Sequence, residues 1–173
     1  MKLRSLSSIL FYLTRAIASV YGLIVSYAVL VFTMHLVWPD AAPLAVADGR
    51  FEIFYPFTSK VFLLGEMDAT YLMQMLGLMT LYAVFFWLLG NVFLTFRQIT
   101  LFTPKGVRRL NLFWLYSITA PVLSIVSLTI LNEIEPAAQL ISILHIIIGI
   151  FAYFMAAIFK QGLKLQVQQE FTI

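Results

Sequence analysis

The chain has 173 residues, of which 62% are hydrophobic and only 11% are charged, with a formal net charge of +3. A soluble domain carries roughly 25% charged residues, so this composition excludes a water-soluble globular domain, and its low polarity excludes a disordered chain. The absence of cysteine excludes disulfides, thiolate metal sites and cysteine nucleophiles. We therefore predict an all-α integral membrane protein.

Four apolar runs are long enough to provide the about 20 helical residues that cross a bilayer. The runs are continuously apolar and do not alternate, which favours helices over barrel strands. The first run is about 23 residues long, whereas a secretory signal has an apolar run of about 7–15 residues, so we expect an uncleaved anchor. We predict a single four-helix membrane domain over residues 1–173. Its spans cover about 16–38, 71–96, 110–131 and 138–159.

Leucines at spacings of three to four residues precede the first span. Such spacing indicates either a short amphipathic helix along the inner leaflet or a cytoplasmic extension of the first span. Both interpretations stay open. The leucines are Leu3, Leu6, Leu10 and Leu13.

The first outer loop, residues 39–70, contains two segments rich in β-forming residues, 50–55 and 60–64. Residues 56–59 separate them and can form a turn, so we predict a small β-hairpin. An isolated hairpin is marginal in water, so its aromatic side chains should pack on the outer ends of the helices. The hairpin is either a lid over the bundle or a surface that senses a ligand or partner.

The loop before the third span contains Thr103 and Pro104, an N-cap residue followed by proline at the first helical position. We therefore expect the third helix to begin before the membrane. Its first turns carry Lys105, Arg108 and Arg109. Such a basic cluster attracts anionic lipid or docks a protein.

Basic residues collect on one side of the predicted spans. Of the 11 Lys and Arg residues, only Arg50 and Lys60 lie in the first outer loop. The positive-inside rule therefore places both termini in the cytoplasm. We expect a multi-pass protein of the bacterial inner membrane.

The predicted spans contain no Asp, Glu or Lys. They therefore lack the carboxylates of proton-coupled pumps and the paired groups of intramembrane hydrolases, and no phosphate-binding or zinc motif occurs. We predict no catalytic residue, no metal and no cofactor. The intramembrane polar residues of interest are Asn91, Ser117, Ser124 and His145.

Small residues mark two faces where helices should approach closely. His145 shares a face with Gly149, Ala152 and Ala156, so it should point into the bundle and bond to a carbonyl or hydroxyl of a neighbouring helix. Asn91 should likewise bond across to another helix. The first span carries a second such face. It consists of Ala18, Gly22 and Ser26. In the third span, Pro121 should produce a kink.

Two cytoplasmic segments carry a family resemblance. Residues 102–110 read FTPKGVRRL, and residues 159–165 read FKQGLKL before a terminal EFTI. These segments resemble the loop-to-third-helix motif and the closing pattern of a bacterial four-helix membrane family, domain of unknown function 2975. Residues 99–101 and Gln168 depart from the pattern. The family has no established activity. Its members are often encoded beside a small helix-turn-helix regulator, so the resemblance implies a regulatory partner.

We expect a non-enzymatic regulatory or accessory membrane protein that docks a cytoplasmic partner but binds no nucleic acid directly. The partner would be such a regulator, another membrane subunit or a second copy of the chain. One alternative is a subunit of an oligomeric transporter or channel lined by Asn91, Ser117, Ser124 and Ser127. Another is a haem-bearing electron carrier using His35 and His145. The expected docking residues are Lys105, Arg108, Arg109, Lys160, Lys164 and Glu170.

Overall fold

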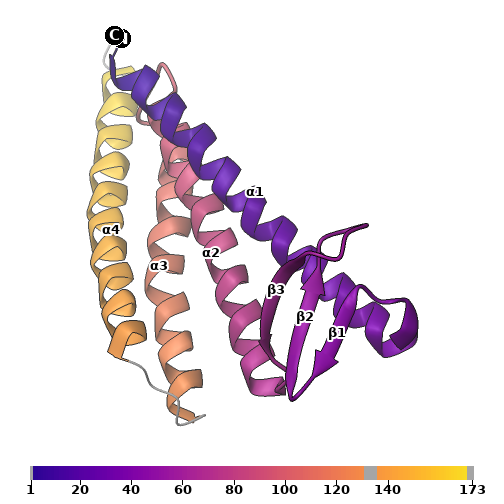
Figure 1. Cartoon of the computed structure of the whole chain (residues 1–173). Helices are drawn as coiled ribbons and strands as arrows, with labels where there is room; N and C mark the ends of the chain where they lie inside the picture. Colours follow the sequence, from indigo (N-terminus) through magenta and orange to yellow (C-terminus); the bar gives the residue numbers. More distant parts are fainter. Residues whose placement is uncertain (1, 131–135, 171–173) are drawn as a thin grey trace. The chain divides into compact units, whose positions relative to one another are not determined.

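The computed structural model describes residues 2–130 and 136–170, with the backbone alone at 2, 3, 41, 130, 136–138 and 170 (Figure 1). The described chain is mostly helical and carries one small sheet. All four long helices are long and apolar enough to cross a membrane, which confirms the predicted number of candidate spans. The helices are α1 (Lys2–Val37), α2 (Ala69–Phe96), α3 (Pro104–Ile130) and α4 (Pro136–Glu170).

The helices extend beyond the predicted spans. Helix α1 is continuous from Lys2, so the leucine-rich stretch extends the first span and does not form a separate helix. Helix α4 likewise continues to Glu170. Hydropathy identifies only the apolar part of a helix. The helix itself continues into the polar flanks, because adding a turn to an existing helix costs little free energy.

Side-chain caps set the starts of α2 and α3. The backbone N–H of Gly106 donates to Thr103 Oγ1 at 3.0 Å, which confirms the predicted N-cap before Pro104. At the start of α2, Asp68 Oδ2 accepts hydrogen bonds from the N–H groups of Thr70 and Tyr71, at 2.8 and 3.0 Å. Each cap satisfies amide donors that have no partner within the helix.

Within the predicted membrane domain, contacts divide the chain into two compact units. The first unit consists of residues 1–16 and 85–173, and the second of residues 17–84.

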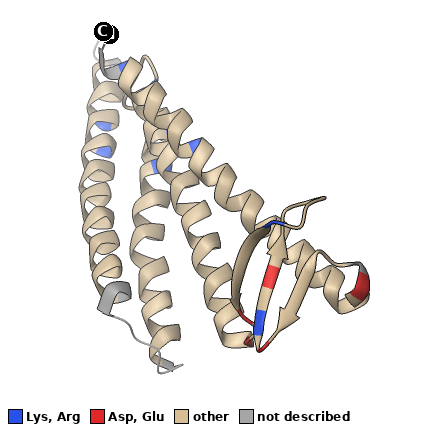
Figure 2. Ribbon diagram, viewed as in Figure 1, with Lys and Arg blue, Asp and Glu red and all other residues tan. Residues whose placement is uncertain are grey.

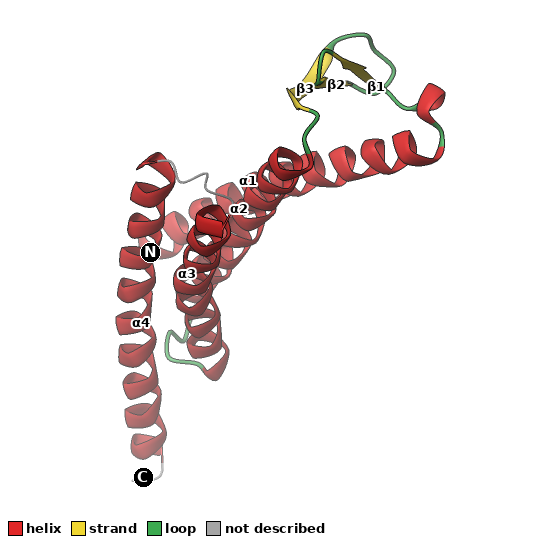
Figure 3. Ribbon diagram, turned by 90° about the horizontal axis from the view of Figure 1, so that it is seen from below, coloured by secondary structure: helices red, strands yellow, loops and turns green. Residues whose placement is uncertain are grey.

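The sheet of the second unit has three antiparallel strands with β2 in the middle (Figure 3). The predicted hairpin is present as the β2–β3 pair, but we missed the first strand. Asp48 and Gly49 join β1 to β2 and both have positive φ, at 51° and 73°. An Asp-Gly pair is the usual sequence of such two-residue turns. The strands are β1 (Leu44–Ala47), β2 (Arg50–Phe54) and β3 (Val61–Glu66), after a short 3-10 helix, η1 (Pro39–Ala41).

One face of this sheet belongs to a small apolar core. Phe51 and Ile53 alternate along β2 and are fully buried with Val31 of α1. The Phe51 ring lies edge-on to that of Phe32, with centroids 5.2 Å apart. The hydroxyl of Tyr27 donates to the Phe54 carbonyl at 2.6 Å. The sheet is therefore held on α1, as its aromatic content indicated.

Helices α3 and α4 pack closely in the first unit. A Cβ added at Gly149 would lie 2.7 Å from Ile118 Cγ1 and 3.3 Å from the Trp114 carbonyl oxygen. Ala152 and Ala156 of the same face are buried. The predicted small-residue face of α4 is thus confirmed, and it faces α3. Proline at 121 lies inside the continuous helix α3.

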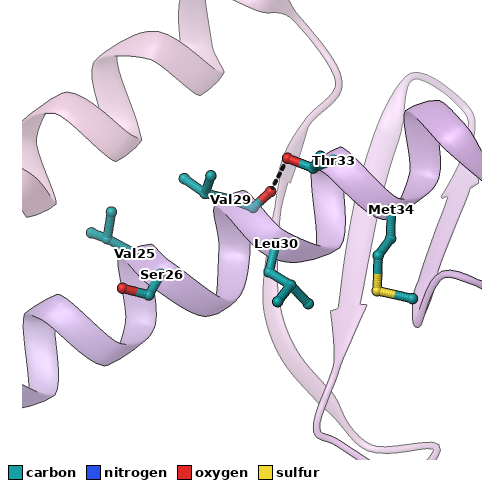
Figure 4. Close-up of a pocket in the computed structure, with 6 residues that line it drawn as sticks. All are labelled: Val25, Ser26, Val29, Leu30, Thr33 and Met34. Carbon is teal, nitrogen blue, oxygen red and sulfur yellow. Dashed lines mark hydrogen bonds between the residues drawn. The ribbon is translucent and has the colours of Figure 1, made fainter.

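The corresponding face of α1 is only partly covered. Ala18 is buried, but a Cβ at Gly22 would meet no described atom within 4 Å. The expected close contact is therefore wrong at Gly22. Further along α1, one shallow apolar pocket follows the helix surface, and Thr33 Oγ1 bonds there to the Val29 carbonyl at 2.7 Å (Figure 4). It is lined by Val25, Ser26, Val29, Leu30, Thr33 and Met34.

Candidate functional site

Arg15 of α1 is fixed against α2 in the first unit. Its Nη2 donates to Asn91 Oδ1 at 2.6 Å, and its Cζ lies 3.5 Å from the centroid of the Trp87 ring. Trp87 and Asn91 are four residues apart and therefore share one face of α2. The predicted hydrogen bond from Asn91 to another helix is confirmed, and its partner is Arg15.

Gly90 makes this approach of α1 to α2 possible. A Cβ there would lie 3.0 Å from Thr14 Oγ1 and 3.5 Å from Arg15 Nε. Thr14 in turn donates its hydroxyl to the Leu10 carbonyl at 2.8 Å, so this polar side chain is satisfied within α1. Any larger residue at 90 would press on Thr14 and on Arg15 itself.

A second arginine lies over the aromatic rings of α1. Arg97 Cζ lies 5.5 Å from the Phe11 centroid and 5.2 Å from that of Tyr12. Arg15 Cζ is 5.3 Å from the same Phe11 ring. All three distances are within the range of cation–π attraction. These rings give the two cations an apolar surface at the ends of their spans.

Arg109 of α3 adds a third guanidinium. Helix α3 packs on α2 next to Asn91, because a Cβ at Gly106 would lie 2.7 Å from Thr95 Cγ2. Arg109 follows one turn later on α3, near Arg15, and the two positive charges repel each other. The Nη1 atoms of Arg15 and of Arg109 are both buried, and neither has a hydrogen-bond partner among the described residues. We call Arg15, Trp87, Asn91 and Arg109 the arginine site.

Exposed cations lie near the start of α3 and the end of α4. These two ends meet, because the Phe102 and Phe159 rings have centroids 5.3 Å apart and a Cβ at Gly162 would lie 2.6 Å from the Phe102 ring. None of the side chains described in the first unit is a carboxylate (Figure 2). We call the exposed set the basic face. It consists of Lys105, Arg108, Lys160 and Lys164.

The predicted docking residues thus divide into three groups. Four of them form the basic face, whereas Arg109 turns its Nη1 into the protein and belongs to the arginine site. Glu170 ends α4, and its side chain lies outside the described residues. The docking role of all six stays a prediction.

His145 forms a hydrogen bond within its own helix. Its Nδ1 lies 2.8 Å from the carbonyl oxygen of Ile141, one turn earlier in α4. The expected hydrogen bond to a neighbouring helix stays a prediction. The ring also packs edge-on against Phe85, with centroids 4.8 Å apart. His35 belongs to the second unit and His145 to the first.

The serines of α3 differ in their surroundings. Ser117 is fully buried and its Oγ has no hydrogen-bond partner, whereas Ser124 is half-buried. Ser127 donates to the Leu123 carbonyl at 2.7 Å. This last bond satisfies the hydroxyl within its own helix.

The predicted spans begin directly after Arg15 and end directly before Arg97, but sequence reasoning missed the site that Arg15 helps to form. The available signal was on α2, where Trp87 and Asn91 share one face and Gly90 leaves room for a neighbour. A stacking ring and an amide acceptor four residues apart suit a guanidinium group. The identity of the approaching helix was not encoded in any local pattern.

Four candidate membrane-crossing helices and a small antiparallel sheet define, by length and composition, a multi-pass membrane protein. The model of the family described as Protein of unknown function (DUF2975) matches residues 33–173, and the chain belongs to this family. This confirms the resemblance noted at residues 102–110 and 159–173. No curated protein and no solved structure matches the chain.

Proposed function

We propose that this protein is a non-enzymatic regulatory or accessory protein of the bacterial inner membrane, with both termini in the cytoplasm, whose basic face docks a partner. The observation that supports this most is the meeting of the start of α3 with the end of α4. This contact places four exposed cations at one end of the first unit, which has no described carboxylate to neutralise them.

The chemistry of the basic face favours a partner with an acidic surface. Complementary charge speeds encounter and selects among partners, and no carboxylate among the described side chains of the first unit weakens the attraction of these cations for an acidic surface. A small cytoplasmic regulator of the helix-turn-helix type, as the family resemblance implies, would bind through acidic residues outside its DNA-contacting helix. The membrane protein itself would contact no nucleic acid.

Co-purification from native membranes tests the docking role. We expect Lys160→Gln with Lys164→Gln to reduce recovery of the partner at least about tenfold, with a further loss at raised salt because exposed charges are screened. The matched control is Arg50→Gln with Lys60→Gln, which removes the same charge from the second unit. Equal recovery with both double variants would reject docking on the basic face.

The proposed orientation has its own test, because the chain has no cysteine and any single cysteine is a unique reporter. We expect a membrane-impermeant maleimide to label Lys60→Cys in cells with a permeable outer membrane. Lys164→Cys should be labelled only after the inner membrane is opened. The reverse pattern would place the basic face outside the cell.

A further inference from the structure

The arginine site has an unbalanced charge. Two guanidinium groups whose charges repel each other lie between α1, α2 and α3, and the side chains described in the first unit supply no carboxylate. In the sequence of that unit, Glu133 and Glu135 follow the C-terminus of α3, whereas Arg109 lies near its N-terminus. Buried ionised groups are costly unless they are paired. A counter-charge from outside the chain would remove this cost.

The site also has free donors in a fixed position. Trp87 holds one face of the Arg15 guanidinium and Asn91 holds its Nη2, so the direction of the group is set by two contacts. Nη1 of Arg15 and Nη1 of Arg109 are buried without a partner among the described residues. A buried donor with no acceptor is destabilising, and more so when it is charged. An oxyanion would accept from both donors at once and reduce the repulsion between the two charges.

The chemistry and the depth of the site together select the anion. Guanidinium forks match the oxygens of phosphate and bind them through paired, charge-assisted hydrogen bonds. Arg15 and Arg109 directly precede the predicted spans 16–38 and 110–131, where lipid headgroups would lie. Phe11 and Trp87 provide an apolar wall beside the cations that suits acyl chains.

We infer that the arginine site binds a phosphate group, supplied by the headgroup of an anionic phospholipid at the edge of the bilayer. The lipid phosphate accepts from the Nη1 atoms of Arg15 and Arg109, and its charge offsets their repulsion. A lipid bound there joins α1 to α3 and steadies the first unit. This site uses the inward-facing donors, so it is independent of the partner docking proposed for the exposed basic face.

The test compares two adjacent arginines of α3 in the full-length protein. The protein is reconstituted in phosphatidylcholine bilayers, with and without a small fraction of phosphatidylglycerol that carries brominated chains. Bromine quenches nearby tryptophan fluorescence, and Trp38→Phe with Trp114→Phe leaves Trp87 as the single reporter. We expect Arg109→Gln to lower the apparent affinity for phosphatidylglycerol at least about tenfold. Arg108→Gln, which removes an exposed charge, should change it less than twofold.

A second substitution separates phosphate recognition from simple charge. Arg15→Lys keeps the positive charge but removes the planar guanidinium fork. The affinity of this variant for phosphatidylglycerol should therefore be several-fold lower than that of the wild-type protein. Circular dichroism of each variant reports helix content, so a loss of fold is distinguished from a loss of the site. Equal affinity in wild-type, Arg109→Gln and Arg108→Gln proteins that all retain their helices would overturn the inference.

The source of the phosphate is tested in neutral detergent with inorganic phosphate alone. We expect millimolar phosphate to leave the thermal midpoint of the wild-type protein within about 1 °C, while phosphatidylglycerol raises it by several degrees. Inorganic phosphate could instead raise the midpoint as strongly as phosphatidylglycerol does, and only in the protein with Arg15 and Arg109 intact. That result would support the phosphate site and overturn the lipid as the source of the phosphate. An absence of any response to both would overturn the site itself.

Discussion

The two units of this protein use different chemistry. The first unit packs helix on helix through small residues of α4 and through an apolar core that includes Phe85, Phe113 and Phe159, and its described charged side chains are all cationic. The second unit packs a sheet on α1 through large aromatic rings, and it holds every carboxylate side chain that the structure describes. These are Asp40, Asp48, Glu52, Glu66 and Asp68.

This division determines where each kind of interaction is available. Because every described carboxylate side chain lies in the second unit, the attraction of the first unit for anions is not cancelled by its own described side chains. Both units bury large apolar residues, and in the second unit these residues hold a sheet on α1. A mutation beneath the sheet should therefore affect mainly the second unit, whereas a change in the spacing of α3 and α4 should affect mainly the first.

The largest effect is expected from Phe51→Ala. Its side chain is fully buried beneath the sheet and contacts Phe32, and removal of a buried phenylalanine costs about 3–5 kcal/mol. Native-state proteolysis at Arg50, which lies within β2, measures the opening of this sheet. At about 1.4 kcal/mol for each factor of ten, cleavage should accelerate by about a hundredfold or more.

Phe57→Ala is the matched control for that prediction. Phe57 is fully exposed in the turn between β2 and β3, so its loss should leave cleavage at Arg50 nearly unchanged. If both variants behaved alike, the apolar core of the second unit would not be what holds the sheet.

The next effect concerns the spacing of α3 and α4. Gly149→Ala places a Cβ 2.7 Å from Ile118 Cγ1 and 3.3 Å from a backbone oxygen that cannot rotate away. Overpacking of this kind costs about 1–3 kcal/mol. The free energy of unfolding in mixed detergent micelles should fall by that amount.

Gly22→Ala tests the same chemistry where no neighbour is present. A Cβ there meets no described atom within 4 Å, and alanine favours a helix more than glycine does. We therefore expect unchanged or slightly higher stability in the same assay. A comparable loss from both variants would contradict the packing argument.

A smaller effect is expected at the start of α3. Thr103→Ala removes the oxygen that accepts from the Gly106 amide, and loss of such a cap costs about 1 kcal/mol. Thr103→Ser retains the hydroxyl and serves as the control. Neither alanine nor serine has a side chain that titrates between pH 3 and 8. The stability difference between these two variants should therefore not change with pH in that range.

The elements of this fold were predictable where the signal is local. Long apolar runs gave four candidate spans, Thr103 with Pro104 gave the start of α3, and two β-rich segments gave the β2–β3 hairpin. The first strand was missed because four residues of alternating small and branched side chains carry little pattern. The Asp48–Gly49 turn was the better signal, and it was not used.

The arginine site was less predictable for a physical reason. Arg15, Asn91 and Arg109 lie on three different helices, and hydropathy says which residues are in a span but not which helices meet. Asn91 was identified as polar within a span, and its need for a partner was clear. Its partner depended on the close approach of α1 at Gly90, which is a property of the tertiary packing.

The smallest effect, and the only one of these that depends on pH, belongs to the cap of α2. The amides of Tyr71 and Thr70 donate to the Asp68 carboxylate, and these bonds, led by that of Tyr71, hold the pKa of Asp68 below its ordinary value. A carboxylate whose pKa is lower in the folded state contributes stability above its unfolded pKa of about 4 and loses it as pH falls through the lower, folded pKa.

Asp68→Asn retains an acceptor oxygen but cannot titrate. Protection of the Thr70 and Tyr71 amides from hydrogen exchange should therefore be greater in the wild type than in Asp68→Asn above pH 5, where the ionised carboxylate also favours the positive end of the helix dipole. The advantage should shrink below pH 4, and comparison of the two proteins at each pH removes the intrinsic dependence of exchange and the titration of the other carboxylates. An advantage that stayed constant down to pH 2 would show that the charge of Asp68 plays no part in starting α2, and Thr103 and Asp68 would then be equivalent caps.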